Sequence, residues 1–210
     1  MRACLCVLIA VITAACEPQI EELPASRARR RDTSGWTSAA PSNAAPKPCG
    51  APKKSCIRPS PPEPTRTLLR DGGADPSCPP DPEVRPKLRS GRVVFVEAKS
   101  AAVKVEIAEK EPHRMRGLMY RTEMPEDHGM IFRFDESVVH RFWMHNTCIP
   151  LDMLFIEEDG TIVGIEENVP TLNDATYECG CPSKYVLELN AGWARRHGVV
   201  AGQRVRLEGI

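Results

Sequence analysis

Apolar and polar residues alternate with a period of two in several short stretches of the carboxyl-terminal half of the chain. Between residues 102 and 108, three aliphatic residues fall on one side, and Lys104 and Glu106 fall on the other. Such alternation is typical of a strand with one buried face. Similar patterns predict eight short strands, at residues 93–96, 102–108, 129–134, 140–145, 151–157, 161–169, 184–189 and 204–207.

Two short helices are predicted between these strands. Residues 112–119 begin with a proline, which the first turn of a helix tolerates. Asn190 can cap a second helix at residues 191–197, which would end at Gly198. Eight strands and two helices predict a mostly β domain at residues 91–210, a compact β-sandwich or barrel-like fold. About 120 residues suffice for one hydrophobic core.

Proline dominates the stretch that precedes this domain. Residues 17–90 hold 15 of the 20 prolines, and Trp36 is their only aromatic residue. Proline removes backbone donors and fixes φ, so regular structure does not propagate through such a segment. With few apolar groups to bury, the segment cannot offset its ordering entropy. We therefore predict a disordered linker over residues 16–90.

The amino end is typical of an export signal. Arg2 is followed by an apolar stretch, residues 3–12, which is too short to span a bilayer. Ala14 and Ala15 precede Cys16, an ending that resembles a lipobox, although Thr13 stands where an aliphatic residue is usual. We predict a signal peptide at residues 1–15 and lipidation of Cys16, which would anchor the protein to a membrane of the cell envelope. Ordinary cleavage that leaves a soluble exported protein is the alternative.

Charge divides at the same boundary. Residues 17–90 carry 13 Lys and Arg against 9 Asp and Glu, whereas residues 91–210 carry 14 against 19. An acidic domain without a basic stripe argues against nucleic acid as a partner. The basic run at residues 27–31 is either a solvated cluster or a contact to anionic lipid.

Cysteine usage fits an oxidising compartment. Six cysteines remain after residues 1–16 are set aside, and an even number favours disulfides. The six allow about 15 pairings, among which the sequence does not choose. The simplest division pairs Cys49 with Cys56 in the linker, and a bridge from Cys78 to the domain is a further possibility.

Three blocks identify the folded region. They read R-G-L-M-Y-R at residues 116–121, F-W-M-H-N-T-C-I-P-L-D at residues 142–152 and Y-V-L-E-L-N-A-G at residues 185–192. In this order they resemble the bacterial and archaeal family catalogued as domain of unknown function 192, over about residues 91–208. The resemblance implies a compact, mostly β sandwich fold and implies no reaction. The chain departs from the family pattern at His145 and Cys148.

Polar residues inside these blocks are the candidate site. Arg116 and Arg121 offer planar guanidinium groups suited to carboxylate or phosphate. Alternatively, one arginine pairs with Asp152 or Glu188 and locks the helix to the sheet. A carboxylate that enters an apolar strand must be paired or lie at an opening, because an isolated buried charge is too costly. Asp152 and Glu188 both occupy such positions.

Four functions compete for these residues. The first is a non-catalytic pocket for a small molecule or envelope polymer, formed by Arg116, Arg121, Asn146, Asp152 and Glu188 with Trp143 as a stacking surface. The second is a hydrolytic enzyme that uses Asp152 with Glu188, or His145 with Cys148. The third is a metal site from His145, Cys148, Cys179 and Cys181. The fourth is a purely structural network in an interaction domain. We predict the binding module, with no cofactor and no resident metal.

Overall fold

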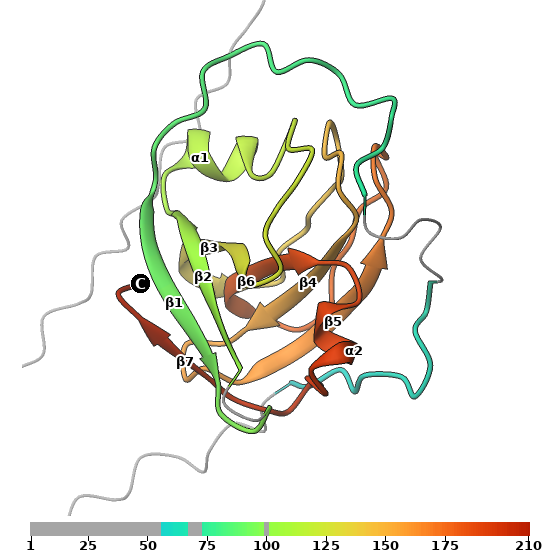
Figure 1. The fold of residues 1–210 in the computed structure, drawn as a ribbon. Coiled ribbons are helices and arrows are strands. Elements are labelled where there is room, and N and C mark those ends of the chain that lie inside the picture. Colours follow the sequence, from blue (N-terminus) through green and yellow to red (C-terminus); the bar gives the residue numbers. More distant parts are fainter. Residues whose placement is uncertain (1–55, 67–72, 99–100) are drawn as a thin grey trace, which may run out of the picture. The chain divides into compact units, whose positions relative to one another are not determined.

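In the described part of the chain, seven strands form a single curled sheet (Figure 1). The computed structural model describes residues 56–66, 73–98 and 101–210, so the predicted signal peptide, Cys16 and Cys49 lie outside the described residues. The strand order is β5-β4-β6-β3-β2-β1-β7. The strands are β1 (Arg89–Phe95), β2 (Ala102–Ala108), β3 (His128–Val138), β4 (Leu151–Ile156), β5 (Ile162–Val169), β6 (Ser183–Asn190) and β7 (Val205–Glu208), and the helices are α1 (Glu111–Arg116) and α2 (Trp193–Arg196).

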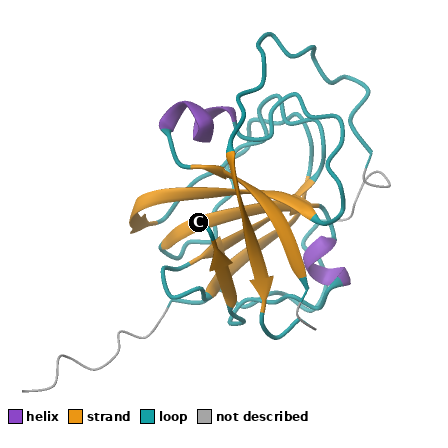
Figure 2. Cartoon of the chain, turned by 60° about the vertical axis from the view of Figure 1, so that its left-hand side comes forward, coloured by secondary structure: helices purple, strands orange, loops and turns teal. Residues whose placement is uncertain are grey.

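The two edges of the sheet approach each other at one end. The amide of Ile162 donates to the carbonyl of Gln203 at 2.9 Å, and the amide of Val205 donates to the carbonyl of Gly160 at 2.9 Å. Gly160 has a φ of +85°, and a Cβ there would collide with the carbonyl oxygen of Val205. Glycine is therefore required where the edges meet. The sheet curls into a half-barrel, seen from a second side in Figure 2.

Alternating side chains along the strands form two apolar clusters on opposite faces of the sheet. In β4, Leu154 belongs to one cluster and Met153 and Phe155 to the other. The first cluster includes Trp193 of α2, and the second includes Leu118, which follows α1. Because successive strand residues point to opposite faces, each face buries its own set. The candidate site lies on the second face.

The predicted mostly β, barrel-like fold with two short helices is confirmed, with two local differences. The predicted strand at residues 140–145 is wrong, because within it Phe142 forms one isolated bridge, to Tyr177, and the chain then turns at Asn146, where φ is +53°. The predicted cap of the second helix is also wrong. Asn190 instead donates to the carbonyl of Met124 at 2.9 Å.

Two segments of the predicted linker lie against the domain, while residues 16–55 and 67–72 of that linker lie outside the described residues. Residues 56–66 are joined to the domain by a disulfide between Cys56 and Cys181, and residues 73–88 by one between Cys78 and Cys148. The pairing of Cys49 with Cys56 is therefore wrong, and the bridge from Cys78 to the domain is confirmed. Covalent bonds and ion pairs offset the ordering entropy that composition alone could not.

Ion pairs reinforce the first of these segments. Arg58 and Arg66 contact the two carboxylate oxygens of Glu166 at 2.5 and 2.7 Å. Glu166 lies on β5, at the edge of the sheet, with only 8% of its side chain exposed. The predicted domain thus contains a buried carboxylate whose partners come from the segment that precedes it.

The two disulfides indicate an oxidising compartment. Such bonds persist in oxidising environments, which is typical of exported proteins. Among the described residues, no helix is long and apolar enough to cross a membrane.

Candidate functional site

Glu188 lies at the centre of the sheet, with its side chain in the second apolar face. It pairs with Met130 of β3 and Met153 of β4, and is 4% exposed. Its carboxyl group has no hydrogen bond or ion pair with any residue in the described part of the chain, although the charge of Arg121 acts on it. Burial raises the pKa of Glu188 to about 8, against a partial lowering by Arg121. Glu188 is therefore a neutral acid at pH 7, able to donate a hydrogen bond.

A cavity of about 30 Å³ opens at Glu188, beneath α1. This volume suits a group of the size of a hydroxyl or a water molecule. Aromatic, aliphatic and polar residues line the cavity. Its lining includes Arg116, Leu118, Phe132, Phe142, Trp143, Thr147 and Glu188.

Trp143 forms an accessible aromatic wall of this cavity. It is 44% exposed and stacks on His145, with ring centroids 4.8 Å apart. The Nδ1 of His145 lies 2.7 Å from a carboxylate oxygen of Asp174, which fixes the imidazole under the indole. A partly exposed, held indole is suited to stack on the apolar face of a ring.

Asn146 positions the loop that carries Trp143. Its side-chain amide donates to the hydroxyl of Tyr120 at 2.8 Å, and its carbonyl accepts from the amide of Tyr120 at 2.8 Å. Both residues have positive φ, +53° for Asn146 and +62° for Tyr120. These two bonds join the sequence block that contains Asn146 to the block that contains Tyr120. Asn146 therefore affects the site by holding the backbone of its loop in place.

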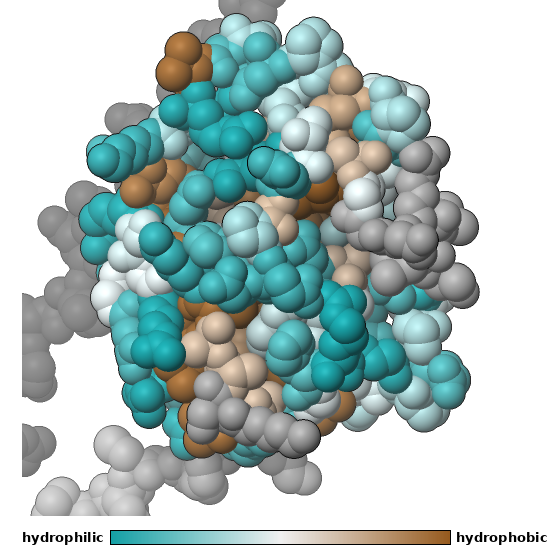
Figure 3. Space-filling view, in the orientation of Figure 1, coloured by the Kyte–Doolittle hydropathy of each residue, from teal (hydrophilic) through white to brown (hydrophobic). Residues whose placement is uncertain are grey.

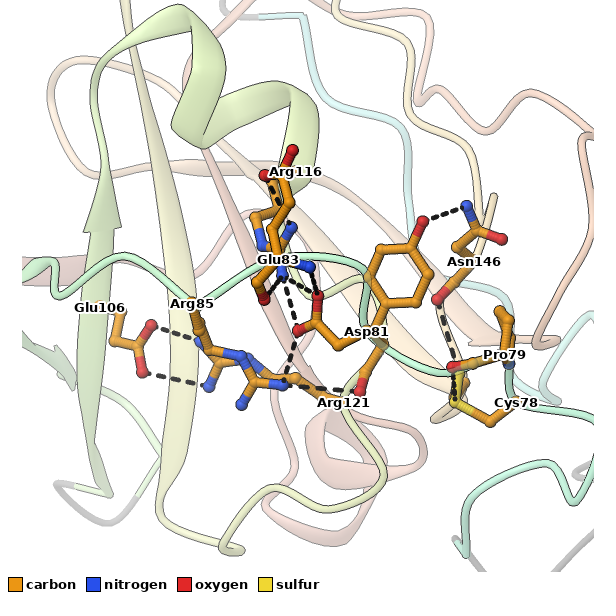
Figure 4. Close-up of polar contacts among 11 residues, drawn as sticks. Cys78, Pro79, Asp81, Glu83, Arg85, Glu106, Arg116, Arg121 and Asn146 are labelled. Carbon is orange, nitrogen blue, oxygen red and sulfur yellow. Dashed lines mark hydrogen bonds and ion pairs between the residues drawn. A yellow bond between two sulfur atoms is a disulfide. The ribbon is translucent and has the colours of Figure 1, made fainter.

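The two arginines are both engaged, but not by Asp152 or Glu188. Arg121 forms a two-pronged ion pair with Glu106 of β2, while its buried Nε has no hydrogen-bond partner among the described residues. Arg116 contacts both carboxylate oxygens of Asp81, at 2.5 and 2.6 Å (Figure 4). Arg116 also lines the cavity, whereas Asp81 is not among the lining residues.

Asp152 lies on the opposite face of the sheet from Glu188. It pairs with Leu189, whose neighbour Glu188 points the other way. Its fully buried carboxyl accepts hydrogen bonds from the backbone amides of Asn168, Gly192 and Ala194, at 2.9, 3.0 and 3.0 Å. Burial raises the pKa of Asp152, and these three bonds partly offset that rise. The residue ties β5 and the start of α2 to β4.

Disulfides engage two of the cysteines considered as alternative metal ligands. Cys148 and Cys181 are both bonded to amino-terminal cysteines, and Cys179 is a buried cysteine that forms no disulfide with any described residue. Burial raises the pKa of Cys179, which disfavours the thiolate that binds metal. The described residues contain no cluster of His, Cys, Asp or Glu that could hold a metal ion. Cys148 is likewise unable to act as a nucleophile with His145 while its disulfide is intact.

The structure thus brings together Arg116, Trp143 and Glu188 at one cavity and places Arg121 and Asn146 in support of it. The sequence did not indicate the contributions of Thr147, Phe132, Asp81 and Glu106. Asp81 lies in the proline-rich segment, where no pattern marked it. In the view of Figure 3, hydrophilic residues cover most of the surface and hydrophobic residues appear in separate patches.

Two solved structures are similar to this chain. One is described as a "putative transcription regulator", from Sinorhizobium meliloti 1021, and is 42% identical, with a TM-score of 0.56, over 59% of this chain and 98% of that one. Another, from Novosphingobium aromaticivorans, is described as a protein of unknown function and is 32% identical, with a TM-score of 0.53, over 55% of this chain and 83% of that one. The comparison with curated proteins gives no match.

A family model matches residues 93–207, more than half of the chain. Its description is "Uncharacterized ACR", domain of unknown function 192. The matched residues run from β1 to β7 and include every lining residue of the cavity named above. Asp81 and both amino-terminal segments lie outside the match. The chain belongs to the family of domain of unknown function 192.

Proposed function

We propose that this protein is a non-catalytic binding module of the cell envelope, which holds a hydroxyl-rich small molecule or one unit of an envelope polymer at the Glu188 cavity. The observation that carries the proposal is a buried, neutral acid without a hydrogen-bond partner in the described part of the chain, at the floor of a cavity. A perturbed pKa in a cleft is a frequent property of functional sites.

Each part of the cavity has a role in this proposal. A ligand hydroxyl enters the space of about 30 Å³ and accepts a hydrogen bond from Glu188. The ring that carries this hydroxyl lies across the mouth, against the exposed indole of Trp143. Arg116, another lining residue, is held in place by its ion pair with Asp81.

Binding is favoured over hydrolysis by the arrangement of the carboxyl groups. Glycoside hydrolysis generally requires two carboxyl groups that flank one bond. Asp152 and Glu188 point to opposite faces of the sheet, and Asp152 is already bonded to three backbone amides. A single neutral acid can orient a ligand but does not supply this pair.

Location completes the proposal. The two disulfides support an exported protein, and the lipobox-like sequence at Cys16 supports a lipid anchor. The net negative charge of residues 91–210 argues against a nucleic-acid role of the kind that the description of the Sinorhizobium protein would imply. Mass measurement of the native protein tests the anchor, because a diacylglyceryl group on Cys16 is expected and an unmodified Cys16 would contradict it.

Binding can be tested with two sugars of bacterial cell walls that form a matched pair. N-acetylglucosamine and N-acetylmuramic acid share the ring and its acetamido group, and the second adds a carboxylate. We expect at least one to bind the full chain in calorimetric titration, with weaker binding in Glu188→Gln and Trp143→Ala. Glu136→Gln, which changes an exposed acid of β3, should bind as the wild type does. Equal binding by all four proteins, or no binding by any, would refute the proposed site.

A further inference from the structure

A groove adjoins the Glu188 cavity, between α1 and the segment that precedes β1. This segment, residues 73–88, is here named the strap, and it runs past α1 on its way to β1 (Figure 1). The groove has a volume of about 470 Å³. Its lining includes Pro82, Val84 and Pro86 of the strap, Met115 of α1, and Met119 and Tyr120 of the turn after α1.

The walls of the groove are held in place by bonds within the chain. The strap is attached to the domain by the disulfide between Cys78 and Cys148. Closer to the groove, both carboxylate oxygens of Asp81 contact the guanidinium group of Arg116, at 2.5 and 2.6 Å. A groove that exists before binding loses little conformational entropy when a ligand enters it.

The groove and the Glu188 cavity share part of their walls. Met115, Arg116 and Met119 line both of them. The two hollows therefore meet along α1 and the turn after it. Methionine side chains are flexible and fit surfaces of different shapes, so this boundary can accommodate a ligand that extends across it.

The lining of the groove suits an aliphatic group. Val84 is 97% exposed and Met115 is 55% exposed. Exposed apolar residues that gather along a groove are typical of a binding surface. The hydrophilic residues among the described lining are Glu83, His113 and Arg116, and the first and last of these form an ion pair at 3.6 Å. Most of the surface offered to a ligand is therefore apolar.

The small volume of the Glu188 cavity gives the groove its role. At about 30 Å³, the cavity holds a hydroxyl group, and the remainder of a ligand must lie outside it. We infer that the groove is the outer subsite of this cavity, and that it receives the aliphatic chain of an amphiphile whose hydroxyl-bearing ring lies against Trp143. The inference rests on the proposed function and narrows its ligand class to a sugar that carries an alkyl or acyl chain.

The methyl and n-octyl β-glycosides of N-acetylglucosamine test this inference in calorimetric titration of the full chain. They share the sugar ring and differ in the aliphatic chain, and the octyl glycoside is kept below its micelle concentration. Burial of one methylene group corresponds to about a fourfold gain in affinity. We expect the octyl glycoside to bind more tightly by about tenfold or more, because two buried methylene groups suffice for that ratio.

Two valine substitutions form a matched pair. Val84→Asp should lower the ratio of the two affinities to about threefold or less, because a carboxylate at the groove disfavours an aliphatic neighbour. Val200→Asp should leave the ratio unchanged, since Val200 is also exposed but is not among the lining residues of either hollow. Glu188→Gln should weaken binding of both glycosides and keep their ratio.

The outcomes separate the inference from the proposed function. If the wild type binds both glycosides equally, or if both valine variants change the ratio alike, the groove is not a subsite, while the proposed function stands. If Glu188→Gln weakens the methyl glycoside but not the octyl glycoside, the chain binds independently of the cavity and the inference is wrong. If Val84→Asp converts a dimer to a monomer in sedimentation and the ratio is one, the groove is an interface between copies. If no protein binds either glycoside, the proposed function fails and the inference fails with it.

Discussion

Replacement of Glu188 by glutamine should stabilise the protein, and the gain should grow with pH. Glutamine keeps the shape of the neutral acid but cannot ionise. The pKa of Glu188 is about 8 in the folded protein, against 4.5 for an unperturbed glutamate. Because the folded pKa is the higher one, the contribution of Glu188 to stability is fully present below pH 4.5 and is lost as pH rises through 8.

The magnitude follows from these two pKa values. A shift of one pKa unit corresponds to about 1.4 kcal/mol. Ionisation of Glu188 in the unfolded state therefore lowers the stability of the folded protein by about 1 kcal/mol at pH 5 and about 3 kcal/mol at pH 7. At pH 8.5 the cost reaches about 5 kcal/mol by the same relation. The difference in unfolding free energy between Glu188→Gln and the wild type should therefore rise by about 4 kcal/mol from pH 5 to pH 8.5.

Urea unfolding of both proteins at pH 5, 7 and 8.5 measures this difference. Glu136→Gln is the control, because this exposed acid of β3 is solvated in both states. A difference that stays constant across the three pH values would show that Glu188 is not a buried neutral acid. A uniform loss of stability would instead show that its carboxylate has a partner that glutamine cannot replace.

Further predictions concern binding and stability. Binding of N-acetylglucosamine should weaken in titrations as pH rises through about 8, where Glu188 loses the proton that it donates; binding that is independent of pH would contradict this role. Arg66→Gln should lower the unfolding free energy by about 1 kcal/mol, since Glu166 keeps one arginine. Asp152→Ala should cost about 2 kcal/mol or more, because three buried amides lose their acceptor. Cys56→Ser opens a loop with a sequence separation of 125 and should cost up to about 5 kcal/mol by loop entropy, measured as a lower urea midpoint.

Most strands could be predicted from the sequence because burial leaves a pattern. A strand with one buried face alternates apolar and polar residues, and a strand buried on both faces is a continuous apolar run. The alternation of residues 102–108 became β2, with Val103, Val105 and Ile107 buried. Residues 140–145 have strand-like composition, but Phe142 has one bridge partner and Asn146 turns the chain. Composition favours a strand, and the availability of a neighbour decides whether one forms.

The site was only partly predictable because it depends on strand register. Asp152 lies between Leu151 and Met153, and Glu188 lies between Leu187 and Leu189, so the two acids look equivalent in the sequence. The register of β4 against β6 places Asp152 opposite Leu189 and Glu188 opposite Met153. This pairing sends the acids to opposite faces, and the sequence does not specify it.

The amino-terminal segments could not be predicted from composition. Their many prolines predict that these segments cannot form a core of their own. The prolines do not reveal the contacts that the domain supplies to them. Glu166 is buried on β5 and draws Arg58 and Arg66 to the domain, while Cys148 and Cys181 supply covalent attachment. Long-range pairings of this kind leave no local pattern in the sequence.

The central claim is that a neutral acid at the floor of the cavity meets a ligand hydroxyl. A carbon-13 NMR titration of the Glu188 carboxyl, with and without N-acetylglucosamine or N-acetylmuramic acid, tests it most directly. The claim predicts a pKa of about 8 in the free protein and a change in the carboxyl resonance when one of the sugars binds. A carboxyl that titrates near 4.5 and responds to neither sugar would contradict it.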